Sequence, residues 1–356
     1  MIAYAFPPCQ RRCFVAISPV LWYTFSMKKL LPILLLLCCI AIGVLWNTGC
    51  SATVPPPSET APPPTPFATD TPAPTPVPTP TPVPTPFSVI WLSDTQSMAY
   101  SFPESLVRMG QWIEDNKERL NIVYILQTGD AVESGFNPAQ WAAVDGLLDR
   151  CRDIPYFAIA GNHEIGVNRH DYSAWLARPN VLALPPEQTY LDGKAAYARI
   201  TAGGVPLLFI GAGWEAEEAS ADWMNDVLRA YPDDVAILLL HSYIDSGGDP
   251  TVAGKKMRTL VVEPNPNIRL VLSGHIPGHF TKLDAFDSDG DGTADRTVVT
   301  SEYDYSTAGV RNGQMRILTF DPGTRTLSIA TYSPVTDCYY RDGGIRGDTI
   351  LIEDAF

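Results

Sequence analysis

From residue 88 onward, short apolar runs alternate with amphipathic stretches, and this alternation limits the fold more than any other feature of the sequence. Three runs have the composition of buried strands, at 88–92, 122–127 and 156–160. The two stretches between them, 104–120 and 138–150, have the apolar spacing of helices. Strands joined in this way by helices form parallel sheets through right-handed crossovers. The sequence therefore predicts one α/β domain over 88–356, which ends in an antiparallel hairpin around Asp321-Pro322-Gly323.

The region before this domain has a different composition. Residues 53–86 hold 15 of the 33 prolines of the chain and no glycine. Proline has no amide hydrogen, so such a segment joins neither a helix nor a sheet and favours extended polyproline II. We interpret 51–87 as a Pro/Thr-rich, disordered linker that reaches on the order of 100 Å at roughly 3.1 Å per residue.

Residues 27–50 have the three zones of a secretory signal: two lysines, an apolar run of 17 residues, and small residues at the end. A membrane span is the alternative, but 17 residues that include Pro32 are short for a hydrocarbon core of roughly 30 Å. The last residues resemble a bacterial lipobox, which implies a lipid on Cys50, although Asn47 replaces the usual aliphatic residue. We expect a protein anchored by lipid at the extracytoplasmic face of the bacterial cell membrane, and we interpret 1–26 as an over-extended start.

The charge of the chain restricts its partners. Beyond Cys50 there are 21 basic and 39 acidic residues, which argues against a nucleic-acid-binding face. An acidic surface also repels phosphate, so a phosphate substrate needs a local positive charge, and bound metal ions are the obvious source.

Polar clusters follow five of the predicted strands. They are Asp94-Thr95-Gln96, Gly129-Asp130, Gly161-Asn162-His163-Glu164, His241, and Gly274-His275 with His279. Ligands bind at the carboxyl ends of strands in open α/β sheets, and Asp, Asn and His offer oxygen and nitrogen ligands for Zn, Fe, Mn or Mg. A single Asp at the end of a strand is more often a helix cap than a metal ligand, and a single His more often binds no metal. Five clusters that use four of the five histidines indicate a metal site instead.

The order of these clusters resembles the signature D-x-H, G-D, G-N-H-[DE], H, G-H-x-H of calcineurin-like metallophosphoesterases. The resemblance extends over about 88–335, and Trp91-Leu-Ser-Asp-Thr-Gln96 and Thr331-Tyr-Ser-Pro334 resemble a bacterial subgroup with Gln in place of the D-x-H histidine. It implies a four-layer α/β/β/α sandwich of the metallophosphoesterase type, with two divalent metal ions (Mn, Fe, Zn or Mg) bridged by one aspartate.

The resemblance also assigns ligands. It implies a second metal site that consists of Asp130, Asn162, His241 and His275, with Asp130 as the bridging residue. It implies a first metal site that consists of Asp94, Gln96, Asp130 and the last histidine of the signature. Position 277, where the family has that histidine, is Pro here, and His279 lies two residues later. The first metal site is therefore the part of the centre where this sequence departs from its family.

The implied chemistry is an in-line displacement at phosphorus. Two ions roughly 3.5–4 Å apart lower the pKa of a bridging water and stabilise the phosphate charge. In the family that this chain resembles, His163 is not a ligand but stands near the leaving group, where we expect a general acid oriented by a carboxylate. Glu164 and Glu133 are the candidates for a role behind the ligands. Glu133 is equally well explained as a solvent-facing loop residue.

A second acidic motif lies at 287–295. Asp287, Asp289, Asp291 and Asp295 alternate with small residues, as in the first part of an EF-hand loop, but position 12 of that template is Val298 instead of Glu. We expect a structural calcium ion here, with an acidic turn between two strands as the alternative.

Together these observations predict a monomeric, metal-dependent hydrolase of phosphate mono- or diesters at the cell surface, acting on a small phosphate ester or a nucleotide. The alternative is a binding or scaffold protein of the same fold in which the first metal site has decayed, as Gln96 and Pro277 suggest.

Overall fold

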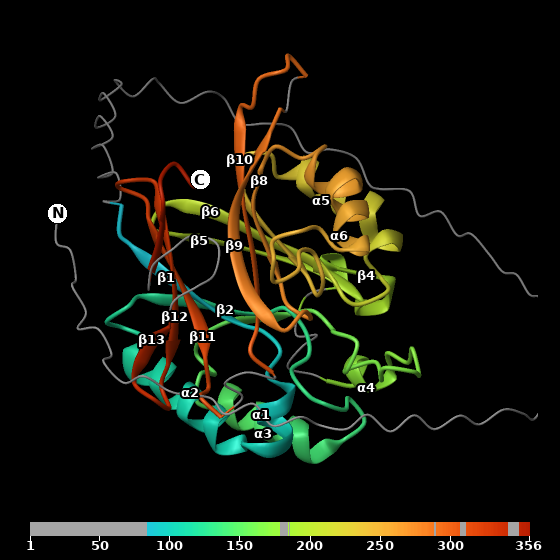
Figure 1. The fold of residues 1–356 in the computed structure, drawn as a ribbon, viewed down its shortest axis with the longest axis vertical. Helices are drawn as coiled ribbons and strands as arrows, with labels where there is room; N and C mark the ends of the chain where they lie inside the picture. Colours follow the sequence, from blue (N-terminus) through green and yellow to red (C-terminus); the bar gives the residue numbers. More distant parts are fainter. Residues whose placement is uncertain (1–83, 179–183, 185, 288–289, 307–310, 341–348) are drawn as a thin grey trace, which may run out of the picture. The chain divides into compact units, whose positions relative to one another are not determined.

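A computed structural model describes residues 84–178, 184, 186–287, 290–306, 311–340 and 349–356. The described strands form two sheets, and helices cover the outer face of each sheet (Figure 1). This is the α/β/β/α sandwich that the sequence predicts, so the predicted fold class is confirmed.

The first sheet contains the parallel strands predicted at the start of the domain. Its strand order is β13 (Cys338–Tyr340), β12 (Thr326–Ser333), β11 (Met315–Asp321), β1 (Phe87–Leu92), β2 (Ile122–Gln127) and β3 (Tyr156–Ala158), with β14 (Thr349–Ile352) also paired to β12. Strands β1, β2 and β3 run parallel, whereas β11 pairs with β1 and β12 in antiparallel fashion. The C-terminal hairpin therefore extends the sheet that the N-terminal βαβαβ unit begins.

The second sheet is built from the middle of the chain. Its order is β4 (Thr189–Tyr190), β5 (Ala195–Ala202), β6 (Val205–Ala212), β7 (Val235–Leu240), β8 (Ile268–Ser273), β10 (Arg296–Asp304) and β9 (Gly278–Phe286). Strands β6, β7, β8 and β10 are parallel, so their carboxyl ends lie at one edge of the sheet.

The helices follow the strands as the apolar spacing predicts. They are α1 (Gln96–Ser101), α2 (Pro103–Asn116), α3 (Pro138–Leu148), α4 (Ser173–Leu176), α5 (Ala221–Ala230) and α6 (Val252–Met257), with short helical turns at η1 (Pro186–Gln188), η2 (Leu191–Gly193), η3 (Glu218–Ser220) and η4 (Arg258–Val262). Helix α3 starts with Pro138, and Asn137 caps it by accepting a hydrogen bond from the Ala139 amide at 3.0 Å. Helix α2 ends four residues earlier than predicted, because the chain turns through Asn121, which has a positive φ of 47°.

Side chains of successive strand residues enter different cores, and this produces the layers. On β1, Val89 and Trp91 pack between the two sheets, whereas Ile90 and Leu92 pack under α1, α2 and α3. On β7, Leu239 joins the core between the sheets, and its neighbours pack under α5 and α6. A strand that is buried on both faces must be apolar throughout, which is why these strands appear as continuous apolar runs.

Candidate metal centre

The carboxyl ends of strands from both sheets meet at the loops that carry the polar clusters. The Asp94 amide donates a hydrogen bond to the carbonyl of Gly129 at 3.1 Å, which joins the loop after β1 to the loop after β2. The Gly274 amide donates to the carbonyl of His241 at 3.0 Å, which joins the loops after β8 and β7. The His241 ring reaches across to the first sheet, where its Nδ1 lies 2.8 Å from the Thr128 carbonyl.

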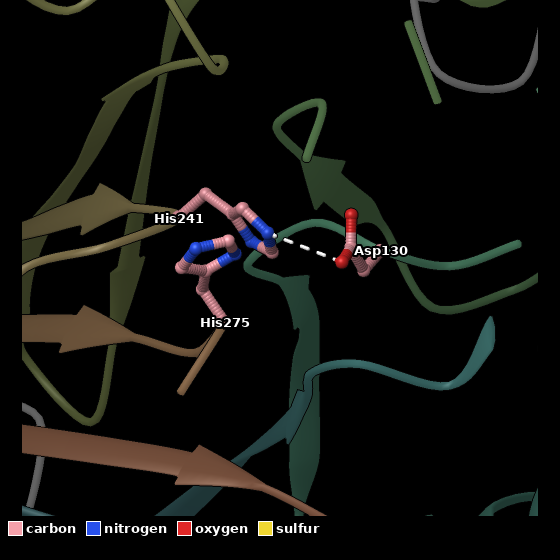
Figure 2. Close-up of side chains that lie close together, drawn as sticks. All are labelled: Asp130, His241 and His275. Carbon is pink, nitrogen blue, oxygen red and sulfur yellow. Dashed lines mark ion pairs between the residues drawn. The ribbon is translucent and has the colours of Figure 1, made fainter. Parts of the chain in front are cut away.

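Three side chains converge closely enough to share an ion. Asp130, His241 and His275 each offer a ligand atom, and these atoms all lie within 4.8 Å of one another (Figure 2). The Nε2 atom of His241 is 3.3 Å from Oδ2 of Asp130 and 3.0 Å from Oδ1 of Asn162. The structure thus gathers around the His241 ring the residues that the resemblance assigns to the second metal site.

The hydrogen bonds of His241 test whether a cation fits this cluster. Both ring nitrogens face oxygen acceptors, since Nδ1 meets the Thr128 carbonyl and Nε2 meets Asn162 and Asp130. A neutral imidazole has a single N–H, so it satisfies only one side. Burial lowers the pKa of His241, but the charge of Asp130 outweighs it and raises this pKa to about 10. A cation at Nε2 satisfies the same oxygens, with Nδ1–H donated to Thr128, and this donor set suits a divalent metal.

The ligand loops hold their backbone in an unusual conformation. Asp94, Asp130 and His275 have positive φ angles of 50°, 51° and 76°. Residues other than Gly seldom adopt this backbone conformation. Each such residue costs on the order of 1–3 kcal/mol, so the surrounding structure must compensate. Close packing at two glycines shows how tight these turns are. A Cβ atom on Gly161 would lie 2.1 Å from Oδ1 of Asp130, and one on Gly274 would lie 1.9 Å from Oδ2 of Asp94.

Glu164 organises the loops that carry the ligands. Its side chain is fully buried, and its carboxylate accepts hydrogen bonds from the backbone amides of Asp130 (2.8 Å), Val132 (3.1 Å) and Gly161 (2.6 Å). Burial and the charge of Asp130 raise the pKa of Glu164 to about 7, although the amide donors act in the opposite direction. Glu164 therefore ties the loop after β2 to the loop after β3.

His163 is oriented by the loop that contains Glu133. Its Nδ1 lies 2.9 Å from the Glu133 carbonyl oxygen and 3.6 Å from Oε1 of the Glu133 side chain. Its Nε2 lies 3.8 Å from Oδ2 of Asp130. Burial lowers the pKa of His163, but Asp130 and Glu133 outweigh it and the pKa is raised. The sequence left open whether Glu133 or Glu164 faces this ring, and of these two it is Glu133 that contacts it.

The residues that the resemblance assigns to the first metal site have other contacts. Both oxygens of Asp94 accept hydrogen bonds, Oδ1 from the His275 amide at 3.0 Å and Oδ2 from the Ser93 hydroxyl. Gln96 is buried, and its Oε1 has no hydrogen-bond partner within the described residues. His279 is the second residue of β9, and its ring packs against Tyr305 with a centroid distance of 5.3 Å.

Trp214 is a residue of the centre that the motifs do not reveal. Its ring packs against His275 at 4.6 Å and against His241 at 5.6 Å between centroids. It also borders a cavity of 420 Å³ beside His275, which Glu217, Ser242 and Lys256 help to line. The only sequence signal for Trp214 is its place just after an apolar strand.

The acidic loop provides its own hydrogen-bond partners. The Asp287 carboxylate accepts from the amides of Gly290 at 2.7 Å and Gly292 at 2.8 Å, and Asp291 accepts from the Thr293 amide at 2.7 Å. Such bonds are typical of acidic turns, the alternative to the calcium loop. Asp289 lies outside the described residues, and the calcium ion stays a prediction.

The predicted start, signal, Cys50 and most of the linker also lie outside the described residues. Within the part of the chain that the structure describes, every helix is too short or too polar to cross a bilayer.

Comparison with known proteins supports the resemblance that the motifs suggest. The family model described as calcineurin-like phosphoesterase matches residues 87–279, which is more than half of the chain. The protein belongs to this family. Its domain is therefore classed as a phosphoric ester hydrolase, its family is metal-dependent, and the cluster around His241 is its candidate ligand set.

Two individual proteins are similar to the chain. An uncharacterised protein of Bacillus subtilis, YvnB, is 35% identical over 272 residues, which are 74% of this chain and 21% of YvnB. The chain thus spans about a fifth of the length of that relative. A purple acid phosphatase from yellow lupin (Lupinus luteus) superposes with a TM-score of 0.52 at 11% identity, over 76% of this chain and 54% of the phosphatase. This second likeness supports the fold alone.

Proposed function

We propose that this protein hydrolyses a phosphate mono- or diester at the outer face of the cell membrane, using two divalent metal ions. The observation that carries the proposal is the position of Asp130. Its Oδ2 atom lies 3.3 Å from Nε2 of His241 and 3.8 Å from Nε2 of His163. Such a carboxylate can hold an ion and stand beside the proton donor at the same time.

Asp130, Asn162, His241 and His275 would hold one ion, and Asp94, Gln96 and Asp130, with His279, the other. Ions bound there would supply Lewis-acid stabilisation of the phosphate oxygens and a water that is acidic at neutral pH.

His163 has the geometry of a general acid. The Glu133 carbonyl accepts the proton on Nδ1, so that Nε2 is the nitrogen that exchanges a proton with the leaving oxygen. The raised pKa of His163 favours the protonated ring that an acid catalyst needs. Glu164 and Gly161 take part only indirectly, by holding Asp130 and Asn162 in their turns.

The cavity beside His275 is our candidate for the pocket that binds the leaving group. Trp214 forms one wall, and Ser242 and Thr251 contribute hydroxyl groups. Lys256 lies at this cavity with its ammonium 2.6 Å from Oε2 of Glu218. A cavity of this size and polarity suits a small phosphate ester or a nucleotide.

The location follows from the sequence. The lipobox-like end of 27–50 supports a lipid on Cys50, and the Pro/Thr-rich linker would hold the domain away from the membrane. Labelling of cells with a radioactive fatty acid tests this step. The label is expected in the wild-type protein and not in a Cys50→Ala variant.

The catalytic proposal is tested with purified full-length protein and two model substrates, para-nitrophenyl phosphate and its bis ester, in the presence of Mn²⁺. Turnover that depends on the metal is expected. Absence of turnover on both esters, despite a tightly bound ion, would favour the alternative of a binding protein with a decayed first metal site.

A His163→Ala variant sharpens this test. Para-nitrophenolate leaves without protonation, so the variant should lose little rate on that ester. On an alkyl phosphate, whose leaving group needs a proton, the loss should be roughly 10²- to 10⁴-fold. Equal losses on both substrates would contradict the acid role.

A further inference from the structure

The end of strand β10 brings a third buried aspartate to the metal centre, and no motif of the family includes it. Asp304 is the last residue of β10 and is 2% exposed. It lies directly across from Gly278 in the antiparallel pair of β9 and β10. On the other side, β10 runs parallel to β8, with Glu302 beside Ser273. Asp304 therefore ends β10 next to the turn of Gly274 and His275.

This turn is the one that holds Asp94. The His275 amide donates to Oδ1 of Asp94 at 3.0 Å, and Gly274 lies so close that a Cβ there would meet Oδ2. Asp94 and Asp130 are also 2% exposed. Three buried carboxylates thus lie on the side of the centre where the chain has Pro277 in place of the family's histidine.

The electrostatics of these carboxylates show that they lie within reach of one another's charge. Burial raises the pKa of Asp94 well above its usual value, and the charge of Asp304 is the next largest cause. Burial and the charge of Asp130 also raise the pKa of Asp304, although its bonds to Ser306 act in the opposite direction. Carboxylates arranged in this way repel one another unless a positive charge lies between them.

A separate observation also indicates a ligand at this place. Gln96, two residues after Asp94, is 6% exposed, and its Oε1 has no hydrogen-bond partner within the described residues. A buried amide oxygen without a donor costs roughly 1–3 kcal/mol, and a metal ion would satisfy it.

His279 and Asp304 are not equivalent replacements for the missing histidine. His279 is the cross-strand partner of Tyr303, and partners point to the same face of the pair. Asp304 follows Tyr303 in the same strand, so it points to the opposite face. The contact of the His279 ring with Tyr305 agrees with this assignment.

We propose that Asp304 is a ligand of the first metal site and replaces the histidine that the family has at position 277. This inference rests on the proposed two-metal function. The first site then consists of Asp94, Gln96, Asp130 and Asp304, which are all oxygen donors, whereas the second has two imidazoles. Oxygen donors favour Mn²⁺ or Mg²⁺ over Zn²⁺, so the two sites differ in metal preference.

The test measures metal binding, not turnover. Full-length protein is equilibrated with Mn²⁺, and its metal content and electron paramagnetic resonance spectrum are recorded. The wild type is expected to bind two ions per chain with a spin-coupled signal. Asp304→Asn keeps the size of the side chain but removes its charge. In this variant the ion of the first site is expected to bind at least about 10-fold more weakly than the ion of the second site, and the spin-coupled signal should be lost.

Two controls make the result specific. Glu302 is on the same strand and is fully buried, so Glu302→Gln, which removes a carboxylate without changing its size, should keep two coupled ions. His279→Ala should also keep two. Circular dichroism confirms folding, and Asp304→Glu, which restores the carboxylate, should recover the second ion if Asp304→Asn folds poorly.

Three results would overturn the inference: one ion in the wild type, two coupled ions of unchanged affinity in Asp304→Asn, or loss of an ion from His279→Ala alone. Two coupled ions in the wild type without hydrolysis of any ester would instead reject the proposed function and leave the ligand assignment intact.

Discussion

The two halves of the metal centre are built in different ways. In the proposed second metal site, Asp130 and Asn162 each lie within hydrogen-bonding distance of His241, and Glu164 fixes the loops behind them. In the first, Asp94 is held by the turn of His275, and Gln96 contributes an oxygen without a donor. The second half matches the family motifs residue by residue, whereas the first half departs from them at 96 and 277. In the half that matches the motifs, hydrogen bonds within the protein hold the ligand residues in place without a bound ion.

The largest effect should come from removing the centre of the second half. His241→Ala deletes the ring that joins Asp130 and Asn162, so an ion at this site loses a direct ligand. Even residues behind the ligands change metal affinity or activity by about 10- to 100-fold, so we expect a loss of more than about 100-fold in kcat/KM. Steady-state kinetics at saturating Mn²⁺ measure it. His170→Ala is the matched control, since His170 is exposed and pairs with Glu215. Retained activity in His241→Ala would contradict the ligand assignment.

The next largest effect should come from replacing Glu164, which supports the ligand loops of the second metal site. Glu164→Ala leaves three backbone amides without their acceptor, and each buried unsatisfied group costs about 1–3 kcal/mol. We expect a loss of roughly 3 kcal/mol in the free energy of unfolding, together with weaker metal binding. Urea denaturation of the metal-free protein isolates the first quantity. The exposed Glu218 provides a control in Glu218→Ala, and equal stability of the two variants would argue against the bracing role of Glu164.

A pair of glycine substitutions separates the two halves. Gly161→Ala places a Cβ against Asp130 and the His241 ring, whereas Gly274→Ala places one against Asp94 and Ser93. The first change should weaken both ions, because Asp130 bridges them, and the second should weaken mainly the ion of the first site. Titration with Mn²⁺ followed by calorimetry distinguishes the outcomes. Loss of both ions in both variants would mean that the halves do not bind independently.

The smallest effect is expected outside the centre. Asp287→Ala removes the acceptor for the Gly290 and Gly292 amides in an exposed loop, where water can replace the lost bonds. The melting temperature without calcium should therefore shift by no more than about 2 °C, and esterase activity should not change. If the loop binds calcium, the wild type should gain stability on addition of Ca²⁺ and the variant should not. A large loss of activity would connect this loop to the centre.

The motifs predicted where the ligands lie in the chain, but not how they are supported. The strand-end positions of Asp130, Asn162, His241 and His275 follow from apolar runs and short motifs, which are local features. The carboxylate beside His163 did not follow, because Glu164 is its neighbour in sequence whereas Glu133 lies 30 residues earlier, in another loop. Only the backbone path decides that Glu164 turns toward the amides and Glu133 toward the ring.

By itself, the sequence determined the α/β class and the family, since these depend on periodicity and on residue types at fixed spacing. The tertiary structure alone decided that Trp214 covers the histidines and that Asp304 lies within reach of the charge of Asp94. The physical reason is distance along the chain. Asp94 and Asp304 are about 200 residues apart, so their approach depends on how the two sheets pack, which no local pattern encodes.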